Sequence, residues 1–196
     1  RYGHIDLMIV DEAHHCSAAS YQNVIANLKA ANPLLKHLGV TATPERADKK
    51  SLAETYQHEA ANVGVMRLIE EGHLCEPKVH GVKTNIDLSW VSVHGSGGNR
   101  DYNQQQLVAA VETSDCFKVV VKTHMEKVGD RPTIAFVPSV AGAYALADLL
   151  KAQGVRAAAA DGTTPKAERE ALLRDFKAGR YTTLVNVALW TEGLDL

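Results

Sequence analysis

The chain has 196 residues, of which 45% are hydrophobic and 22% charged, a composition typical of a globular protein with one large domain or two small ones. Its formal net charge of −2 excludes a general electrostatic attraction to nucleic acid, so any such binding must come from a local set of donors. There is no apolar run of membrane-spanning length, no signal peptide, and no disulfide framework among the three scattered cysteines. These features predict a cytoplasmic protein without a membrane partner.

The first expected element is a buried strand that ends in two carboxylates. Residues 5–10 are apolar apart from one aspartate, and Asp11 and Glu12 follow directly. The carboxyl ends of parallel strands form the rim at which open α/β sheets bind ligands. In phosphoryl transfer, one carboxylate holds Mg²⁺ through water and a second group orients or deprotonates the attacking water. The alternative for these two residues alone is a solvated acidic pair at the start of a loop.

A strand–helix–strand unit is expected from the next residues. An apolar helical face recurs at i, i+3, i+4 and i+7, in Tyr21, Val24, Ile25 and Leu28. The helix ends at Asn32, because the residue before a proline is disfavoured in helical conformation. Residues 38–41 then predict a second strand, closed by Ala42-Thr43-Pro44. This order is typical of a parallel sheet.

The middle of the chain carries weaker signals. Residues 45–50 predict an exposed turn, and residues 65–69 predict a short helix that ends at Gly72. Residues 74–86 are expected to be extended, with Pro77 suited to the start or edge of a strand. Residues 94–99 are rich in glycine and serine and predict a loop or linker.

We therefore expect three parts along the chain. Residues 1–76 form the C-terminal part of a first domain, residues 77–100 form a linker, and residues 101–196 form a second domain.

The second half repeats the strand and helix alternation. An apolar helical stripe stops at Gly129, and after it three strands alternate with two helices, as in a doubly wound sheet. The stripe consists of Phe117, Val120, Val121, His124 and Val128. The later elements are a strand at 133–137, a helix at 139–153, a strand at 155–160, a helix at 166–177 and a strand at 182–189. Trp190 is expected in the core, whereas Trp90 is undecided between a core position and base stacking.

Five segments resemble, in order, motifs of the superfamily 2 helicases of the DEAD/DEAH type. The segment Asp11-Glu12-Ala13-His14 resembles motif II, the Walker B motif. The others are Thr41-Ala42-Thr43-Pro44 for motif III, residues 134–137 for motif IV, residues 161–179 for the G-x-x-x-x-x-R…F…G segment, and residues 191–195 for motif V. The resemblance covers nearly the whole chain. It implies an α/β fold with two RecA-like parallel-sheet domains of the P-loop NTPase type, the first incomplete at its N-terminus and the second at its C-terminus.

The resemblance also implies roles for particular residues in ATP hydrolysis with Mg²⁺. Asp11 would coordinate Mg²⁺ through water, and Glu12 would position or activate the attacking water. His14 would reach towards the second domain and link the nucleotide site to the nucleic-acid site; a histidine that caps a loop is the alternative. Thr41 and Thr43 would carry coupling hydroxyls, although a purely structural role is nearly as plausible for a threonine in a strand.

Further roles fall on the second domain. Gly193 and Asp195 would face the nucleotide, with Gly193 allowing a close approach of the backbone to phosphate. Four residues would contact the nucleic-acid backbone: Ser139, Gly162, Thr163 and Thr191. Short hydroxyls and backbone amides at helix N-termini donate well to phosphate oxygens and do not read base identity.

Two motifs of the family are absent from the sequence. There is no G-x-x-x-x-G-K-S/T phosphate-binding loop and no Q-x-x-G-R-x-x-R segment with its arginine finger. We therefore expect the chain to be part of a longer helicase or translocase, and by itself to bind ATP poorly and hydrolyse it negligibly.

The substrate and two alternatives follow from the same motifs. DNA is favoured over RNA, because Thr191-Glu192-Gly193-Leu194-Asp195 resembles the DNA-repair, phage and restriction branches. One alternative is the motor subunit of a restriction enzyme, which translocates duplex without separating its strands. The other is a non-catalytic module that keeps the fold and binds nucleic acid or a protein partner.

Overall fold

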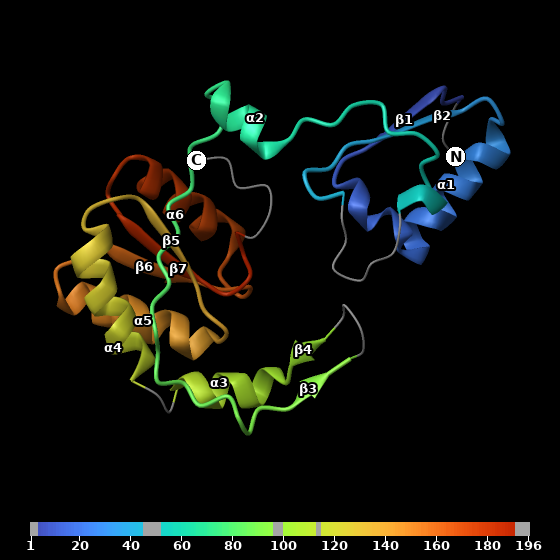
Figure 1. Ribbon diagram of the computed structural model, residues 1–196. Coiled ribbons are helices and arrows are strands. Elements are labelled where there is room, and N and C mark those ends of the chain that lie inside the picture. The colour runs from blue at the N-terminus through green and yellow to red at the C-terminus, as the bar shows by residue number, and fades with distance from the viewer. Residues whose placement is uncertain (1–3, 45–51, 96–99, 113–114, 191–196) are drawn as a thin grey trace. The chain divides into compact units, whose positions relative to one another are not determined.

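The computed structural model describes residues 4–44, 52–95, 100–112 and 115–190 (Figure 1). The chain divides into two compact units, Arg1–Val79 with Gly95–Arg100, and His80–His94 with Asp101–Leu196. The domain limits expected at residues 76 and 100 stay predictions. In the described part of the chain no helix is both long and apolar enough to cross a bilayer.

The first unit is built on two parallel strands, β1 (Leu7–Val10) and β2 (Lys36–Gly39), which the helix α1 (Ala19–Ala31) connects (Figure 1). The strand–helix–strand unit expected from the sequence is confirmed. The expected strand at 38–41 lies two residues too late, because pairing with the four residues of β1 sets the ends of β2.

Helix α1 covers one face of this small sheet. Its buried residue Ile25 packs with Met8 and Val10 of β1, while Leu7 and Ile9 alternate to the other face and are exposed. The strand β1 is followed by a short 3₁₀ helix, η1 (Ala13–Ser17), which begins directly after the two carboxylates.

The middle of the chain has little regular structure. The helix α2 (Val65–Glu70) confirms the short helix expected before Gly72, and a 3₁₀ turn, η2 (Leu52–Glu54), precedes it along the chain. The expected extended segment at 74–86 forms no strand, and its residues are mostly exposed because no neighbouring strand pairs with them. Two-residue strands β3 (Val93–His94) and β4 (Asp101–Tyr102) pair antiparallel after it. The turn expected at 45–50 lies outside the described residues.

The second unit contains a three-stranded parallel sheet in the order β5-β7-β6. Its helices and strands are α3 (Gln104–Glu112), α4 (Cys116–Thr123), the π-helical turn η4 (His124–Val128), β5 (Thr133–Phe136), α5 (Val140–Ala152), β6 (Ala157–Ala160), α6 (Lys166–Lys177) and β7 (Thr183–Asn186). Strands and helices alternate as expected, although β6 and β7 are shorter than the predicted strands at 155–160 and 182–189.

The strand order places α5 and α6 on opposite faces of this sheet. The chain runs from the edge strand β5 through α5 to the other edge strand β6, and then back through α6 to the central strand β7. The two crossovers run in opposite directions across the sheet, and since both are right-handed, their helices lie on opposite faces. Two separate clusters of buried side chains confirm this. The α5 face holds Ala143, Leu146, Ala147, Leu150, Ala157 and Val185, and the α6 face holds Ala158, Ala160, Phe176, Leu184 and Trp190.

Four consecutive alanines make β6, despite their low strand propensity. Ala157 packs on the α5 face and Ala158 and Ala160 on the α6 face, so small side chains let helices approach the strand from both sides. Burial between two layers therefore overrides propensity. The expected core position of Trp190 is confirmed, whereas Trp90 is half exposed.

The helical stripe that precedes β5 changes its winding near its end. Helix α4 continues at His124 as the π-helical turn η4, which stops at Gly129, where φ is +64° and glycine carries no Cβ penalty. The wider turn places the buried His124 ring against β7, with Nε2 3.0 Å from Oγ1 of Thr183. Among the described residues, Nδ1 of His124 has no hydrogen-bond partner.

The buried His124 predicts a loss of stability in mild acid. Burial lowers the pKa of His124 below its usual value, so the unfolded chain takes up a proton at a higher pH than the folded chain. The free energy of unfolding is therefore expected to be highest above about pH 6.5 and to fall as the pH drops below that value. Urea unfolding between about pH 5 and pH 7.5, followed through Trp190 fluorescence, measures this slope. In His124→Gln the slope should be smaller; an unchanged slope would exclude His124 as its source.

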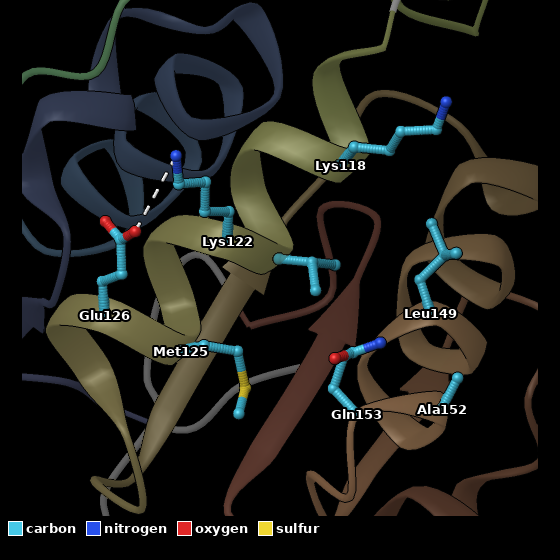
Figure 2. A pocket seen from close by; sticks show the side chains of 8 residues that line it. Lys118, Lys122, Met125, Glu126, Leu149, Ala152 and Gln153 are labelled. Atoms are coloured by element: carbon cyan, nitrogen blue, oxygen red, sulfur yellow. Dashed lines mark ion pairs between the residues drawn. The ribbon is translucent and has the colours of Figure 1, made fainter.

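An open groove of about 450 Å³ lies between α4, η4 and the C-terminal part of α5 (Figure 2). Its charged rim is already paired, Lys122 with Glu126 at 3.9 Å and Lys118 with Asp115 at 2.7 Å. Leu149 lines this groove and lies ten residues after Ser139 along α5, which separates the two residues by roughly 15 Å along the helix axis. The groove is therefore remote from the end of α5 at which ligand contacts are expected.

Candidate functional site

The two carboxylates predicted to serve chemistry lie where β1 meets η1. Asp11 is exposed, and its Oδ1 accepts the backbone N–H of Glu12 at 2.9 Å. Glu12 adopts φ 48° and ψ 48°, a left-handed conformation that costs a residue with a side chain about 1–2 kcal/mol relative to its usual conformations. This left-handed residue joins the end of β1 to the first turn of η1.

His14 gathers the neighbouring polar side chains. Its Nδ1 lies 2.9 Å from Oγ1 of Thr41, 3.2 Å from Oγ1 of Thr43 and 3.3 Å from Oε2 of Glu12. One ring nitrogen thus faces three oxygens, and its proton decides the pairing. A neutral ring with its hydrogen on Nε2 accepts a hydrogen bond from a threonine, whereas a ring with hydrogen on Nδ1 can donate to Glu12.

Backbone bonds fix the two segments that carry this cluster. The N–H of Ala13 donates to the carbonyl of Val40 at 2.9 Å, and the N–H of Val40 donates to the carbonyl of Val10 at the same distance. The N–H of Thr43 also donates to Oγ1 of Thr41 at 3.1 Å. The structure therefore brings together four residues predicted from the sequence: Glu12, His14, Thr41 and Thr43.

These contacts all lie within the first unit. The ring of His14 faces the threonines that follow β2, so the sequence expectation that it reaches towards the second domain stays a prediction. Within the described residues, no three His, Cys, Asp or Glu side chains converge as a metal-binding group.

In the second unit, the predicted backbone contacts lie after β5 and β6. Ser139 is the N-cap of α5, where its Oγ accepts the N–H of Gly142 and donates to Oε1 of Glu112, each at 2.9 Å. Thr163 donates both its backbone N–H and its hydroxyl to Oδ1 of Asp161, each at 2.6 Å. Both predicted hydroxyls therefore donate to carboxylates of their own unit.

Asp161 organises the loop after β6. Hydrogen bonds from Thr163 hold the pKa of Asp161 below its usual range, and Tyr144 donates to the second carboxylate oxygen at 3.1 Å. The Asp161 N–H donates to Oγ1 of Thr164 at 3.0 Å, which closes the turn. The neighbouring Gly162 is exposed at the tip of this turn. The loop is thus a rigid support that presents backbone rather than free hydroxyls.

Three predicted residues, Thr191, Gly193 and Asp195, lie outside the described residues. The turn that leads to them is described, and it depends on a residue that sequence reasoning missed. Asn186 is fully buried at the end of β7; its Nδ2 donates to the carbonyl of Ala135 at 3.1 Å and its Oδ1 accepts the N–H of Leu189 at 3.0 Å. Ala188 between them has φ 49°. The sequence feature that could have indicated this role is a single amide side chain inside an otherwise apolar run from 184 to 189.

Comparison with known proteins gives matches on both parts of the chain. Residues 112–196 match the family model described as the helicase conserved C-terminal domain, and residues 1–46 match the model of the type III restriction enzyme res subunit. The first contains the segments that resemble motifs IV and V, and the second contains those that resemble motifs II and III.

Curated relatives and a solved structure align along nearly the whole chain. The candidate ATP-dependent helicase IRC3 of Saccharomyces cerevisiae is 30% identical over 98% of this chain and 28% of its own length. A 51.5 kDa protein of a Lactococcus phage is 32% identical over 97% of this chain and 40% of its own length. The structure of S. cerevisiae Dbp5 is 16% identical, with a TM-score of 0.49 over 98% of this chain and 41% of that one. The chain thus spans less than half the length of each.

The order of the matches agrees with the order of the motifs, and the segments that resemble motifs II and III follow the parallel strands β1 and β2. The family models and the helicase-named relative thus support the resemblance of this chain to part of a superfamily 2 helicase.

Proposed function

We propose that this chain supplies the metal and water side of an ATP site in an ATP-dependent helicase or translocase. The observation that carries the proposal is the cluster in which His14 joins Glu12, at the end of β1, to Thr41 and Thr43, after β2. The relatives in S. cerevisiae and Schizosaccharomyces pombe are named as candidate ATP-dependent helicases, which supports the same activity.

Glu12 is the residue that orients or deprotonates the attacking water. Its side chain is 41% exposed, so water and a nucleotide can reach it. The carboxylate of Glu12 lies 3.3 Å from Nδ1 of His14, whereas that of Asp11 accepts the N–H of Glu12, so the two acids have different partners. The strain at this position is consistent with selection for chemistry rather than for stability.

Asp11 fits a magnesium ion bound largely through water. Mg²⁺ in phosphoryl-transfer sites keeps several waters and takes one or two carboxylates together with substrate phosphates, so one exposed carboxylate is sufficient. The bond from the Glu12 N–H fixes one oxygen of Asp11 and thereby orients the carboxylate. When bound, the ion neutralises negative charge on the phosphate oxygens.

Thr41 and Thr43 transmit the state of the ATP site through His14. Because one ring nitrogen faces Glu12 and both hydroxyls, a change in the charge near Glu12 changes which oxygen the ring pairs with. Gly193 and Asp195 face the nucleotide from the second domain in this proposal, which for these two residues rests on the motif resemblance.

Nucleic acid is bound through its backbone at the carboxyl edge of the β5-β7-β6 sheet. Ser139, Gly162, Thr163 and Thr191 supply the contacts, without reading base identity. In the described structure Ser139 donates to Glu112, so a phosphate at the N-terminus of α5 must displace that carboxylate. Glu112 is thus a competitor of phosphate at this position.

Replacing Glu112 with glutamine is therefore expected to strengthen nucleic-acid binding by about three- to tenfold at low salt, because a charge-assisted hydrogen bond is lost and a repelling charge removed. Fluorescence anisotropy with a labelled single strand measures the affinity.

The matched control is Glu126→Gln, which removes an equally exposed negative charge from the same unit at the remote groove. An equal gain in both variants would mean that only net charge matters, and Ser139 would then not be a phosphate contact. The gain should also disappear in Glu112→Gln/Ser139→Ala.

DNA is the favoured substrate because residues 191–195 resemble motif V in the form typical of DNA motors. A Haloarcula marismortui relative that is 26% identical is also named as a candidate DNA 3′–5′ helicase. The match of residues 1–46 to a restriction-enzyme subunit supports a second candidate, a motor that translocates on duplex DNA without separating strands.

One set of assays on the full-length protein separates these functions. ATP turnover is measured with single-stranded DNA, duplex DNA and RNA, and strand displacement is measured on a forked duplex. Stimulation by DNA with displacement supports a helicase, and stimulation by duplex without displacement supports the restriction motor. Stronger stimulation by RNA would overturn the DNA preference, and no turnover with any of the three would favour a non-catalytic module.

The proposed compartment is a reducing one, because the three cysteines of the chain, Cys16, Cys75 and Cys116, form no disulfide. The cytoplasm remains the expected location, and the name of the S. pombe relative places that protein in mitochondria.

A further inference from the structure

Tyr56 packs beneath the turn that carries Glu12 and His14. It lies two residues after the end of η2, and its ring stacks on His37 of β2 with centroids 4.5 Å apart and planes tilted by 37°. The same ring packs on Gly39: a Cβ added there would lie 2.4 Å from Cζ of Tyr56. Only glycine at this position of β2 leaves room for the tyrosine.

The hydroxyl of Tyr56 joins two elements of the first unit. It lies 3.3 Å from Sγ of Cys16 in η1 and 2.9 Å from Nε2 of His37 in β2. Cys16 is fully buried, and burial together with the Cys16 contact raises the pKa of Tyr56. The phenol therefore stays protonated and always has one hydrogen to donate along this chain of three side chains.

A second set of bonds holds the same turn. Nε2 of Gln22 donates to the carbonyl of Cys16 at 2.7 Å and to Oγ1 of Thr55 at 2.8 Å. Thr55 is buried beside Tyr56, so the segment at 52–56 is tied to η1 through a side chain of α1 as well as directly. The segment lies far along the chain from residues 11–16 and has no motif resemblance of its own.

We infer that Tyr56 is a positioning residue for ATP hydrolysis, because its hydroxyl holds η1 through Cys16 and so fixes the turn from Glu12 to His14. This rests on the proposed role of Glu12. The five-residue helix η1 is held on one side by His14 against Thr41 and Thr43, and on the buried side by Cys16 against Tyr56. A short 3₁₀ helix has poor internal hydrogen bonds, so these side-chain contacts contribute to its placement together with the bonds from Ala13 to Val40 and from Gln22 to Cys16.

Tyr56→Phe tests the inference in the full-length protein with a stimulating nucleic acid. The variant keeps the ring over Gly39 and removes only the hydroxyl. The kcat for ATP is expected to fall about three- to tenfold, on the scale of the lost hydrogen bonds to Cys16 and His37, while KM for ATP stays within about twofold. Cys16→Ala should lower kcat by no more than Tyr56→Phe does, and the double variant should be no slower than Tyr56→Phe, because the contact between Cys16 and the Tyr56 hydroxyl is absent in all three.

Three further variants make the result decisive. Tyr21→Phe removes a phenol on an exposed part of α1 and should retain the kcat of the wild type. Cys16→Ser restores a polar partner and should recover most of the rate lost in Cys16→Ala. This comparison tests the contact even if Tyr56→Phe folds poorly. Glu12→Gln reports on the proposed function itself.

The possible outcomes separate the two claims. A wild-type kcat in folded Tyr56→Phe, or losses that multiply in the double variant, would overturn the positioning role while leaving Glu12 in place. A Glu12→Gln protein that turns over ATP at the wild-type rate would overturn the proposed function and this inference with it.

Discussion

Replacing Glu12 with glutamine is expected to lower the rate of ATP hydrolysis by the full-length protein by about a hundredfold or more. Glutamine has nearly the same size and can occupy the same backbone position, but it cannot accept a proton from the attacking water. General-base catalysis contributes about 10²- to 10⁴-fold in enzymes, so the loss should lie in that range. Binding of ATP should change little, because nothing in the proposal assigns Glu12 a contact with the nucleotide in its ground state.

The measurement is steady-state ATP turnover at saturating nucleic acid, together with the affinity for a fluorescent nucleotide. Glu70→Gln in α2 is the matched control, since Glu70 is an exposed glutamate of the same unit with no contact to the site. A Glu12→Gln variant with wild-type turnover would show that another residue serves as the base. Loss of nucleotide affinity to the same extent as kcat would instead assign Glu12 to binding.

Replacing Asn186 with alanine is expected to destabilise the second unit by about 2–4 kcal/mol. The side chain is fully buried and makes two hydrogen bonds, so its removal leaves the carbonyl of Ala135 and the N–H of Leu189 without their partners. A buried polar group left unpaired costs about 1–3 kcal/mol. The turn at Ala188, whose left-handed conformation is already unfavourable, loses the bond that closes it.

Urea unfolding gives the loss of stability, with Leu184→Ala as the comparison. Leu184 is buried next to Asn186 and its truncation should cost about 2–5 kcal/mol through a cavity, without removing a bond from the turn. At a temperature where both variants are folded, ATP turnover should fall in Asn186→Ala more than in Leu184→Ala, because the turn leads directly into residues 191–195. A loss of stability below about 1 kcal/mol in Asn186→Ala would contradict the role of its hydrogen bonds.

Periodicity and turn residues predicted most elements of the fold. The helices α1, α5 and α6 and the strand β5 were predicted within about two residues at each end, because an apolar stripe at helical spacing or a short apolar run is a local signal. The position of β2 was predicted less well, and residues 74–86, which were expected to be extended, form no strand. A strand ends where its partner ends, and pairing is a tertiary property.

The candidate site divides in the same manner. The carboxylates Asp11 and Glu12 were predicted from their place after an apolar run, and Thr41 and Thr43 from their place after the next. The convergence of Glu12, Thr41 and Thr43 on His14 depends on the register of β1 against β2 and on the left-handed turn at Glu12, which no local pattern indicates.

By itself the sequence determined the resemblance to superfamily 2 helicases, the order of the motifs and the chemical type of the residues, since these depend on residue identity at short spacing. Only the tertiary structure decided which side chains share a hydrogen bond. It assigned the hydroxyls of Ser139 and Thr163 to carboxylates, Asn186 to the turn after β7 and Tyr56 to the turn after β1. The physical reason is distance along the chain: a contact between Cys16 and Tyr56 spans forty residues and exists only once strands and helices have packed.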